Sequence, residues 1–229
     1  MKGRARYAIG CLLVSVLLSL FTVPLWGADD EKTLSNAVTV LQAMLHSKDV
    51  PSSVVAKADC IIVLPSVKKF AVGVGGTGGR GPMSCREGKN FNGKWSAPAM
   101  YSIGGASAGL QIGGTATDYN LLIMTSAGAD KVLNGKVKVG SDATAALGPG
   151  ASAGSDIGGA DILTYSRTSG AFAGVSLNGA TLSPDGDANG RMYGNGVSAT
   201  DIVTGTKIKP TAGGKSLMAV LDANAGKKQ

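Results

Sequence analysis

The sequence predicts a single α+β domain in which short N-terminal helices pack on a glycine-rich, mostly antiparallel β core. Apolar residues recur at three- and four-residue steps between about Thr33 and Ser47, which is the helical period. From Cys60 onward, short apolar runs alternate with Gly, Asn, Asp and Pro, as strands and turns do. Glycine supplies 35 of the 229 residues and aromatics only 5%, so the core must bring backbones close together.

The start of the chain has the order of residues found in a secretory signal. Three basic residues precede an apolar run that ends at Phe21, and Gly27 stands just before an acidic triplet. We predict a signal peptide at residues 1–27, cut after Gly27 or Ala28, with an uncleaved anchor as the alternative. In either case the sequence predicts export to the periplasm or cell envelope, or secretion.

The rest of the chain predicts one domain. About 200 residues follow the signal, enough for a substantial core. We place this domain at 28–205 and a weakly structured basic tail at 206–229. Without the signal the formal charge falls from +7 to +4, with 19 Lys and Arg against 15 Asp and Glu. This balance favours an anionic partner, while export and the scarcity of aromatics argue against nucleic acid.

Helices are expected at both ends of the predicted domain. The first would carry an apolar face made of Leu34, Ala37, Val38, Leu41, Met44 and Leu45. This face either packs on the core or lies on a membrane surface. Pro51 and the two serines after it predict a second short helix through Ala58. Two more are expected at 127–133 and 197–204.

Strands are expected through the middle of the domain, separated by turn residues. Their predicted ranges are 60–64, 69–74, 99–103, 108–115, 119–125, 137–139, 162–167 and 171–177. The glycine run from Gly73 to Gly81 is expected to form a flexible hairpin.

Cys60 and Cys85 are the two cysteines left after the predicted signal. An oxidising compartment permits them to pair, so we predict a disulfide. The alternative is a buried free thiol at Cys60, which stands in an apolar run. Two cysteines and the single histidine, His46, do not make a zinc site, and no cofactor is expected.

Several short motifs resemble those of enzymes or metal sites but lack their partners. Two Gly-Ala-Ser-Ala-Gly segments, at 105–109 and 150–154, fit a nucleophile elbow, but the only histidine precedes both. Residues 73–78 fit a dinucleotide-binding pattern, but the sequence after them cannot begin the required helix well. Residues 185–190 resemble half of a calcium loop, but Gly196 stands at the twelfth position, so an acidic turn is expected. No catalytic residue is predicted.

An ordered set of segments resembles the SYLF domain family, over about Thr33 to Thr204. These segments are 56–58 leading into 61–67, the glycine run 73–81, Trp95-Ser96-Ala97-Pro98, 109–113 and 170–177. The family includes the lipid- and actin-binding domain of eukaryotic endocytic proteins and many exported bacterial proteins.

The resemblance implies a non-enzymatic domain that binds phospholipid, phosphoinositides in eukaryotic members, through an N-terminal amphipathic helix and nearby basic residues. Carried over here, the lipid-binding residues are Leu34, Val38, Leu41, Leu45, Lys68 and Lys69. The helix is poor in lysine, and export from a bacterium makes actin and phosphoinositides unexpected partners. An anionic phospholipid membrane surface is therefore the expected ligand. A structural or interaction protein of the envelope, with a protein or glycan partner, is the alternative.

Overall fold

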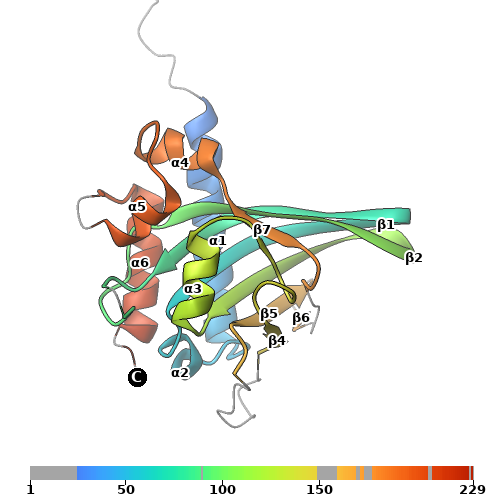
Figure 1. Ribbon diagram of the computed structural model, residues 1–229, viewed down its shortest axis with the longest axis horizontal. Coiled ribbons are helices and arrows are strands. Elements are labelled where there is room, and N and C mark those ends of the chain that lie inside the picture. Colours follow the sequence, from blue (N-terminus) through green and yellow to red (C-terminus); the bar gives the residue numbers. More distant parts are fainter. Residues whose placement is uncertain are drawn as a thin grey trace, which may run out of the picture.

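The computed structural model describes residues 25–88, 90–148, 159–168, 171–172, 177–205, 208–226 and 228. Within these residues, helices surround one curved and mostly antiparallel sheet, and a long two-stranded ribbon projects from the body (Figure 1). The predicted α+β class and the single domain are confirmed. The predicted signal at 1–27 lies outside the described residues except for its last three positions.

The strands of the described residues form one sheet, and the helices lie between them in the chain and at its ends. The helices are α1 (Leu25–His46), α2 (Ser52–Val55), α3 (Ser126–Leu133), α4 (Gly186–Tyr193), α5 (Ala199–Thr204) and α6 (Ala212–Ala225). The strands are β1 (Cys60–Cys85), β2 (Ala99–Ile123), β3 (Val137–Lys138), β4 (Ala145–Leu147), β5 (Ile162–Thr168), β6 (Ala171–Phe172) and β7 (Thr181–Pro184). The order in the sheet is β3-β7-β2-β5-β4, with β1 paired to β2 and β6 paired to β5. All pairs are antiparallel except β4 with β5.

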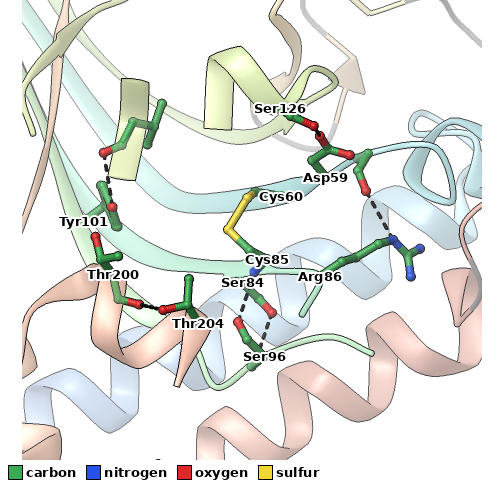
Figure 2. Close-up of a disulfide and its surroundings, with 12 residues drawn as sticks. Asp59, Cys60, Ser84, Cys85, Arg86, Ser96, Tyr101, Ser126, Thr200 and Thr204 are labelled. Carbon is green, nitrogen blue, oxygen red and sulfur yellow. Dashed lines mark hydrogen bonds between the residues drawn. A yellow bond between two sulfur atoms is a disulfide. The ribbon is translucent and has the colours of Figure 1, made fainter. Parts of the chain in front are cut away.

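Strands β1 and β2 pair along almost their whole lengths and form the projection, which we call the ribbon (Figure 1). The ribbon turns back on itself. The two ends of the 26-residue β1 therefore meet, and the Cα atoms of Cys60 and Cys85 lie 3.9 Å apart. A disulfide joins these ends, as predicted. Figure 2 shows this bond with Asp59 beside Cys60 and Arg86 beside Cys85.

The glycine run is a strand, so the hairpin predicted at Gly73 to Gly81 is wrong. These residues pair with residues 101–109 of β2, and the strands predicted separately at 60–64 and 69–74 also belong to β1. The glycines let the two halves of β1 approach. A Cβ at Gly81 would lie 1.9 Å from the carbonyl oxygen of Val63, and one at Gly79 would lie 2.8 Å from a Val67 methyl. Close approach, and not a turn, explains these two positions.

The core lies on both faces of the sheet. Alternate residues of β1 point to opposite sides, so Cys60, Ile62 and Leu64 join one cluster while Ile61 and Val63 join another. Helices α3 and α5 contribute to the first cluster. Helices α1 and α6 cover the second.

The chain end is more ordered than predicted, since the segment expected as a weakly structured tail contains α6. Thr211 caps this helix by accepting a hydrogen bond from the Gly214 amide, and Leu217 and Leu221 are buried. Gly213, which looks like a helix breaker in the sequence, packs against α1. A Cβ there would lie 2.8 Å from that of Leu34.

Arg86 holds the C-terminal end of α6. It is 1% exposed, and its Nη2 donates hydrogen bonds to the carbonyls of Ala225 (2.6 Å) and Ala56 (3.3 Å). Its guanidinium lies 4.3 Å from the ring centroid of Trp95, whose indole N–H also donates to Ala225. A buried cation at carbonyls without helical partners satisfies both the charge and the helix end.

The other predictions have mixed outcomes. Helices near 52–58, 127–133 and 197–204 and strands near 137–139 and 162–167 are confirmed with small shifts in their ends. The predicted strand 171–177 is described only at 171–172 and 177, and its intervening residues lie outside the described part. Strands β4 and β7 and helix α4 were not predicted.

Candidate functional site

The apolar residues predicted to bind lipid on α1 lie in the core. Leu34 and Leu41 are 0% exposed, and Val38 and Leu45 are half-buried against the cluster beneath α1. The structure therefore does not present Leu34 or Leu41 to a membrane. The outward side chains of α1 are mostly uncharged and include Asp29, Lys32, Ser35, Asn36, Thr39, Gln42 and His46.

Lys68 lies on the ribbon, where it shares a strand face with Phe70. Residues two apart on a strand point to the same side, and here both are exposed. Phe70 is 63% exposed, and the only other large apolar side chain recorded as exposed among the described residues is Leu147, at 51%. Sequence reasoning missed Phe70. The feature of the sequence that could have identified it is an aromatic residue directly after two lysines.

Lys69 points to the opposite face of the same strand. It is half-buried, and its Nζ lies 5.7 Å from the ring centroid of Tyr119. Burial lowers the pKa of the Lys69 ammonium. The structure therefore separates the two lysines that the sequence grouped: Lys68 faces outward, and Lys69 packs on an aromatic ring.

The bend at Pro65 and Ser66 positions Lys68. The register between β1 and β2 shifts between Leu64 and Val67, and Ser66 has a positive φ of 51°. The Ser66 amide donates a 2.8 Å hydrogen bond to Asp118 on β2. Asp118 is the single acidic residue of the ribbon strands, which carry three basic ones: Lys68, Lys69 and Arg80.

A cleft of about 390 Å³, whose lining includes several charged and polar residues, lies between α1 and the two halves of β1. Its lining residues are Thr33, Asn36, Pro65, Ser66, Lys68, Gly78, Gly79, Arg80, Ser102 and Asp185. Of the predicted site residues, Lys68 alone lines it. The cleft therefore connects α1 to the outward face of the ribbon.

A buried carboxylate fixes one wall of this cleft. Asp30 on α1 is fully buried and contacts the guanidinium groups of Arg80 and Arg191. Arg191 donates to Asp30 through Nε at 2.8 Å and through Nη2 at 3.1 Å. Removing Asp30 would leave two partly buried cations facing each other, so this group is an anchor between α1, β1 and α4.

The segment that resembles half of a calcium loop is a helix start, so the turn predicted at 185–190 is wrong. Asp185 caps α4 by accepting a 3.0 Å hydrogen bond from the Ala188 amide. Asn189 is buried and bonds the backbone of Met100 through both atoms of its amide. Two of the would-be ligands are therefore engaged in folding.

No cluster of three or more His, Cys, Asp or Glu side chains in the described part of the chain has the placement of a metal site. Among the described helices, none combines the length and apolar character needed to span a membrane.

The chain is similar to known proteins over most of its length. Residues 104–224 match the family model Ysc84, described as "Las17-binding protein actin regulator". An SH3 domain-containing protein of Schizosaccharomyces pombe, PJ696.02, is 31% identical over 188 residues, 79% of this chain and 43% of the relative. Human SH3 domain-containing YSC84-like protein 1 is 32% identical over 184 residues, 77% of this chain and 52% of the relative.

A third relative has a different name. LAS seventeen-binding protein 3 of Saccharomyces cerevisiae is 28% identical over 201 residues, 85% of this chain and 43% of the relative. The chain thus spans about half the length of the curated relatives it matches. Both the family model and the relatives agree with the resemblance in the sequence, and the chain belongs to the Ysc84 family, whose domain is also called SYLF.

Proposed function

We propose that this chain is a non-enzymatic, exported module that associates with anionic phospholipid surfaces through its ribbon. One observation carries the proposal: the exposed Lys68 and the 63% exposed Phe70 lie on one face of an element that projects from the body. A cation beside an exposed aromatic on a projection is the arrangement that a membrane interface favours, because charge meets the headgroups while the ring enters the apolar boundary.

The expected affinity is modest. A basic residue near an anionic surface contributes about 1 kcal/mol, and full burial of a Phe side chain contributes about 1.5–3 kcal/mol. Lys69 adds less than its charge suggests, because it packs on Tyr119. Binding should therefore be reversible and sensitive to salt.

The proposal changes the contact residues inferred from the resemblance. Lys68 and Phe70 would contact lipid, while Leu34, Leu41 and the half-buried Val38 and Leu45 hold α1 to the body. Export is supported by the basic-apolar-small order of residues 1–27 and by the disulfide between Cys60 and Cys85, a bond suited to an oxidising compartment.

Vesicle binding tests the proposal. Purified chain beginning at Ala28 would be titrated with vesicles of phosphatidylcholine containing increasing phosphatidylglycerol, at low and physiological salt. Lys68→Glu and Phe70→Ala should each weaken binding about tenfold, corresponding to about 1.4 kcal/mol. Matched controls are Lys215→Glu, an exposed lysine on α6, and Leu147→Ala, the other exposed apolar residue. Equal effects of all four changes, or no dependence on phosphatidylglycerol, would refute the proposal.

A protein partner is the second candidate, favoured by a groove of about 720 Å³ between α1 and α6. Its lining mixes small apolar and uncharged polar side chains, including Ala43, Ala219, Ala223, Gln42 and Asn224. The family description names actin regulation, so filamentous actin is the first partner to test. Co-sedimentation with actin that survives raised salt and is lost in Ala219→Trp, but not in Lys68→Glu, would favour this candidate.

A further inference from the structure

The cleft between α1 and β1 brings Lys68, which the proposed membrane association already uses, together with charged residues that it does not use. Charges of both signs line the cleft: Lys68 and Arg80 come from the two halves of β1, and Asp185 comes from the start of α4. Hydroxyl and amide groups of Ser66, Ser102 and Asn36 lie among them. A ligand matched to this lining would carry both an anionic and a cationic group.

Capacity for hydrogen bonds remains on both charged walls. Asp185 uses Oδ1 to cap α4, while its Oδ2 lies 4.0 Å from Nη1 of Arg80, which is beyond hydrogen-bond distance. Arg80 gives Nη2 to the buried Asp30. Among the described residues, neither Oδ2 of Asp185 nor Nη1 of Arg80 is engaged in a hydrogen bond. Two residues that line the cleft therefore form an ion pair and still offer one acceptor and one donor for hydrogen bonds.

The net charge of the cleft is small. Asp30 and Asp185 balance Arg80 and Arg191, so Lys68 supplies the excess positive charge, and Asp118 lies nearby through its bond to the Ser66 amide. A highly charged anion would find little uncompensated positive charge there. A zwitterion with one phosphodiester and one ammonium would find a partner for each group.

The exposed ring of Phe70 lies on the ribbon close to the residues that line the cleft. Gly78 and Gly79 line the cleft, and two residues farther along the same half-strand a Cβ at Gly76 would lie 2.9 Å from the Phe70 ring. With a water occupying about 30 Å³ in the liquid, the 390 Å³ cleft has room for a small polar headgroup. A headgroup held there would leave its acyl chains on the side of the exposed ring.

We propose that this cleft binds the headgroup of an aminophospholipid, a phosphodiester that ends in a primary ammonium. The phosphate oxygens accept hydrogen bonds from Lys68 and from Nη1 of Arg80, and the ammonium donates to Oδ2 of Asp185. This inference rests on the proposed membrane association and names the class of lipid whose headgroup the cleft selects. Phosphatidylcholine is the informative comparison, because its trimethylated nitrogen keeps the charge but has no N–H to donate.

The first experiment compares vesicles of constant phosphatidylglycerol content in which phosphatidylethanolamine is replaced by phosphatidylcholine. The wild type should bind the ethanolamine vesicles about tenfold more tightly, as expected for a charged hydrogen bond. Asp185→Asn should lose this preference while keeping the α4 cap, because Asn is also a good N-cap residue. Asp187→Asn, an exposed carboxylate on the same helix, is the matched control.

Lipid packing also differs between vesicles of the two lipids. Comparing Asp185→Asn with Asp187→Asn distinguishes recognition of the headgroup by Asp185 from this difference in packing. A preference that persists in Asp185→Asn, or one that is absent in the wild type, overturns the proposal. If the wild type binds neither vesicle, the proposed membrane association is wrong. A titration with soluble headgroup compounds then tests whether the cleft binds the headgroup independently of a membrane.

That titration follows backbone amide signals of Ser66 and Ser102 by NMR with glycerophosphoethanolamine, glycerophosphocholine and inorganic phosphate. Shifts with the first compound, reduced by Asp185→Asn, support the headgroup site. Equal shifts with inorganic phosphate would assign a simple anion site, and equal shifts with glycerophosphocholine would remove the role of Asp185. Either result, or no shift at all, contradicts the proposal.

Discussion

Helix α1 and the ribbon both place apolar side chains beside polar ones, but the structure uses them differently. Leu41 on α1 is fully buried beneath the helix, whereas Phe70 on the ribbon is 63% exposed. If α1 left the body to bind a membrane, lipid could cover the apolar face of the helix. The residues that α1 now buries would become exposed to water, among them Ile61, Val63, Leu217 and Leu221. An amphipathic pattern therefore identifies a buried face without saying what buries it.

The largest expected effect tests whether the apolar face of α1 is buried in the core. Leu41→Ala should lower the free energy of unfolding by about 2–5 kcal/mol, because it leaves a cavity between α1 and the sheet. Urea unfolding followed by circular dichroism measures this loss, with the exposed Gln42→Ala as the control, expected within about 0.5 kcal/mol of wild type. Lost vesicle binding with unchanged stability would instead make α1 the membrane face.

The next effect concerns the base of the ribbon. Replacing both Cys60 and Cys85 by Ala should lower the free energy of unfolding by about 2–4 kcal/mol, since the bond restricts the unfolded chain and holds the two ends of β1 together. Chemical denaturation of the variant and of oxidised wild type measures the loss, and wild type denatured in the presence of reductant should match the variant. Equal stability of oxidised wild type and variant would contradict this role.

Close packing of the ribbon halves predicts a smaller effect at glycine. Gly81→Ala should destabilise by about 1–3 kcal/mol, because its Cβ would meet the Val63 carbonyl. Gly78→Ala is the control in the same strand, since no atom lies within 4 Å of its Cβ position. Thermal unfolding should separate the two variants. Equal melting temperatures would mean that the halves of β1 are not packed as described.

The smallest expected effect tests the burial of Tyr165 in the core beneath α1. Burial raises the pKa of Tyr165 from 10.0 to about 12. The folded protein then keeps a proton that the unfolded chain releases, so stability falls as pH rises from about 10 to 12. Tyr165→Phe should reduce this alkaline loss by about 1 kcal/mol, allowing for solvent screening. Urea midpoints at pH 9 and about 11.5 measure it, and parallel losses in both proteins would refute it.

Much of the fold was predictable because local patterns dominate it. The three-to-four periodicity of α1 and the apolar run between turn residues at β5 each predict their element correctly. The glycine run misled because glycine serves both turns and close contacts, and only the partner strand distinguishes them. Helix α6 was missed because Gly213 and Gly214 weaken its intrinsic propensity, which packing against Leu34 and burial of Leu217 override.

The candidate site divides in the same way. Lys68 was predicted through the family resemblance, as one of the positive charges nearest to the helix, but the separation of Lys69 depends on strand alternation and on the position of Tyr119. Phe70 and Asp185 were missed because their exposure and their neighbours arise from chain segments far apart. The cleft joins residues from 33 to 185, and no local pattern records that meeting.

The sequence by itself determined the α+β class, the amphipathic α1, the cysteine pair and the family, because each depends on residue type and short-range spacing. Tertiary structure alone decided that α1 faces the core, that the glycine run is a strand and that Lys68, Arg80 and Asp185 line one cleft. The physical reason is that burial and electrostatic pairing depend on contacts between distant segments, whereas periodicity and capping act within a few residues.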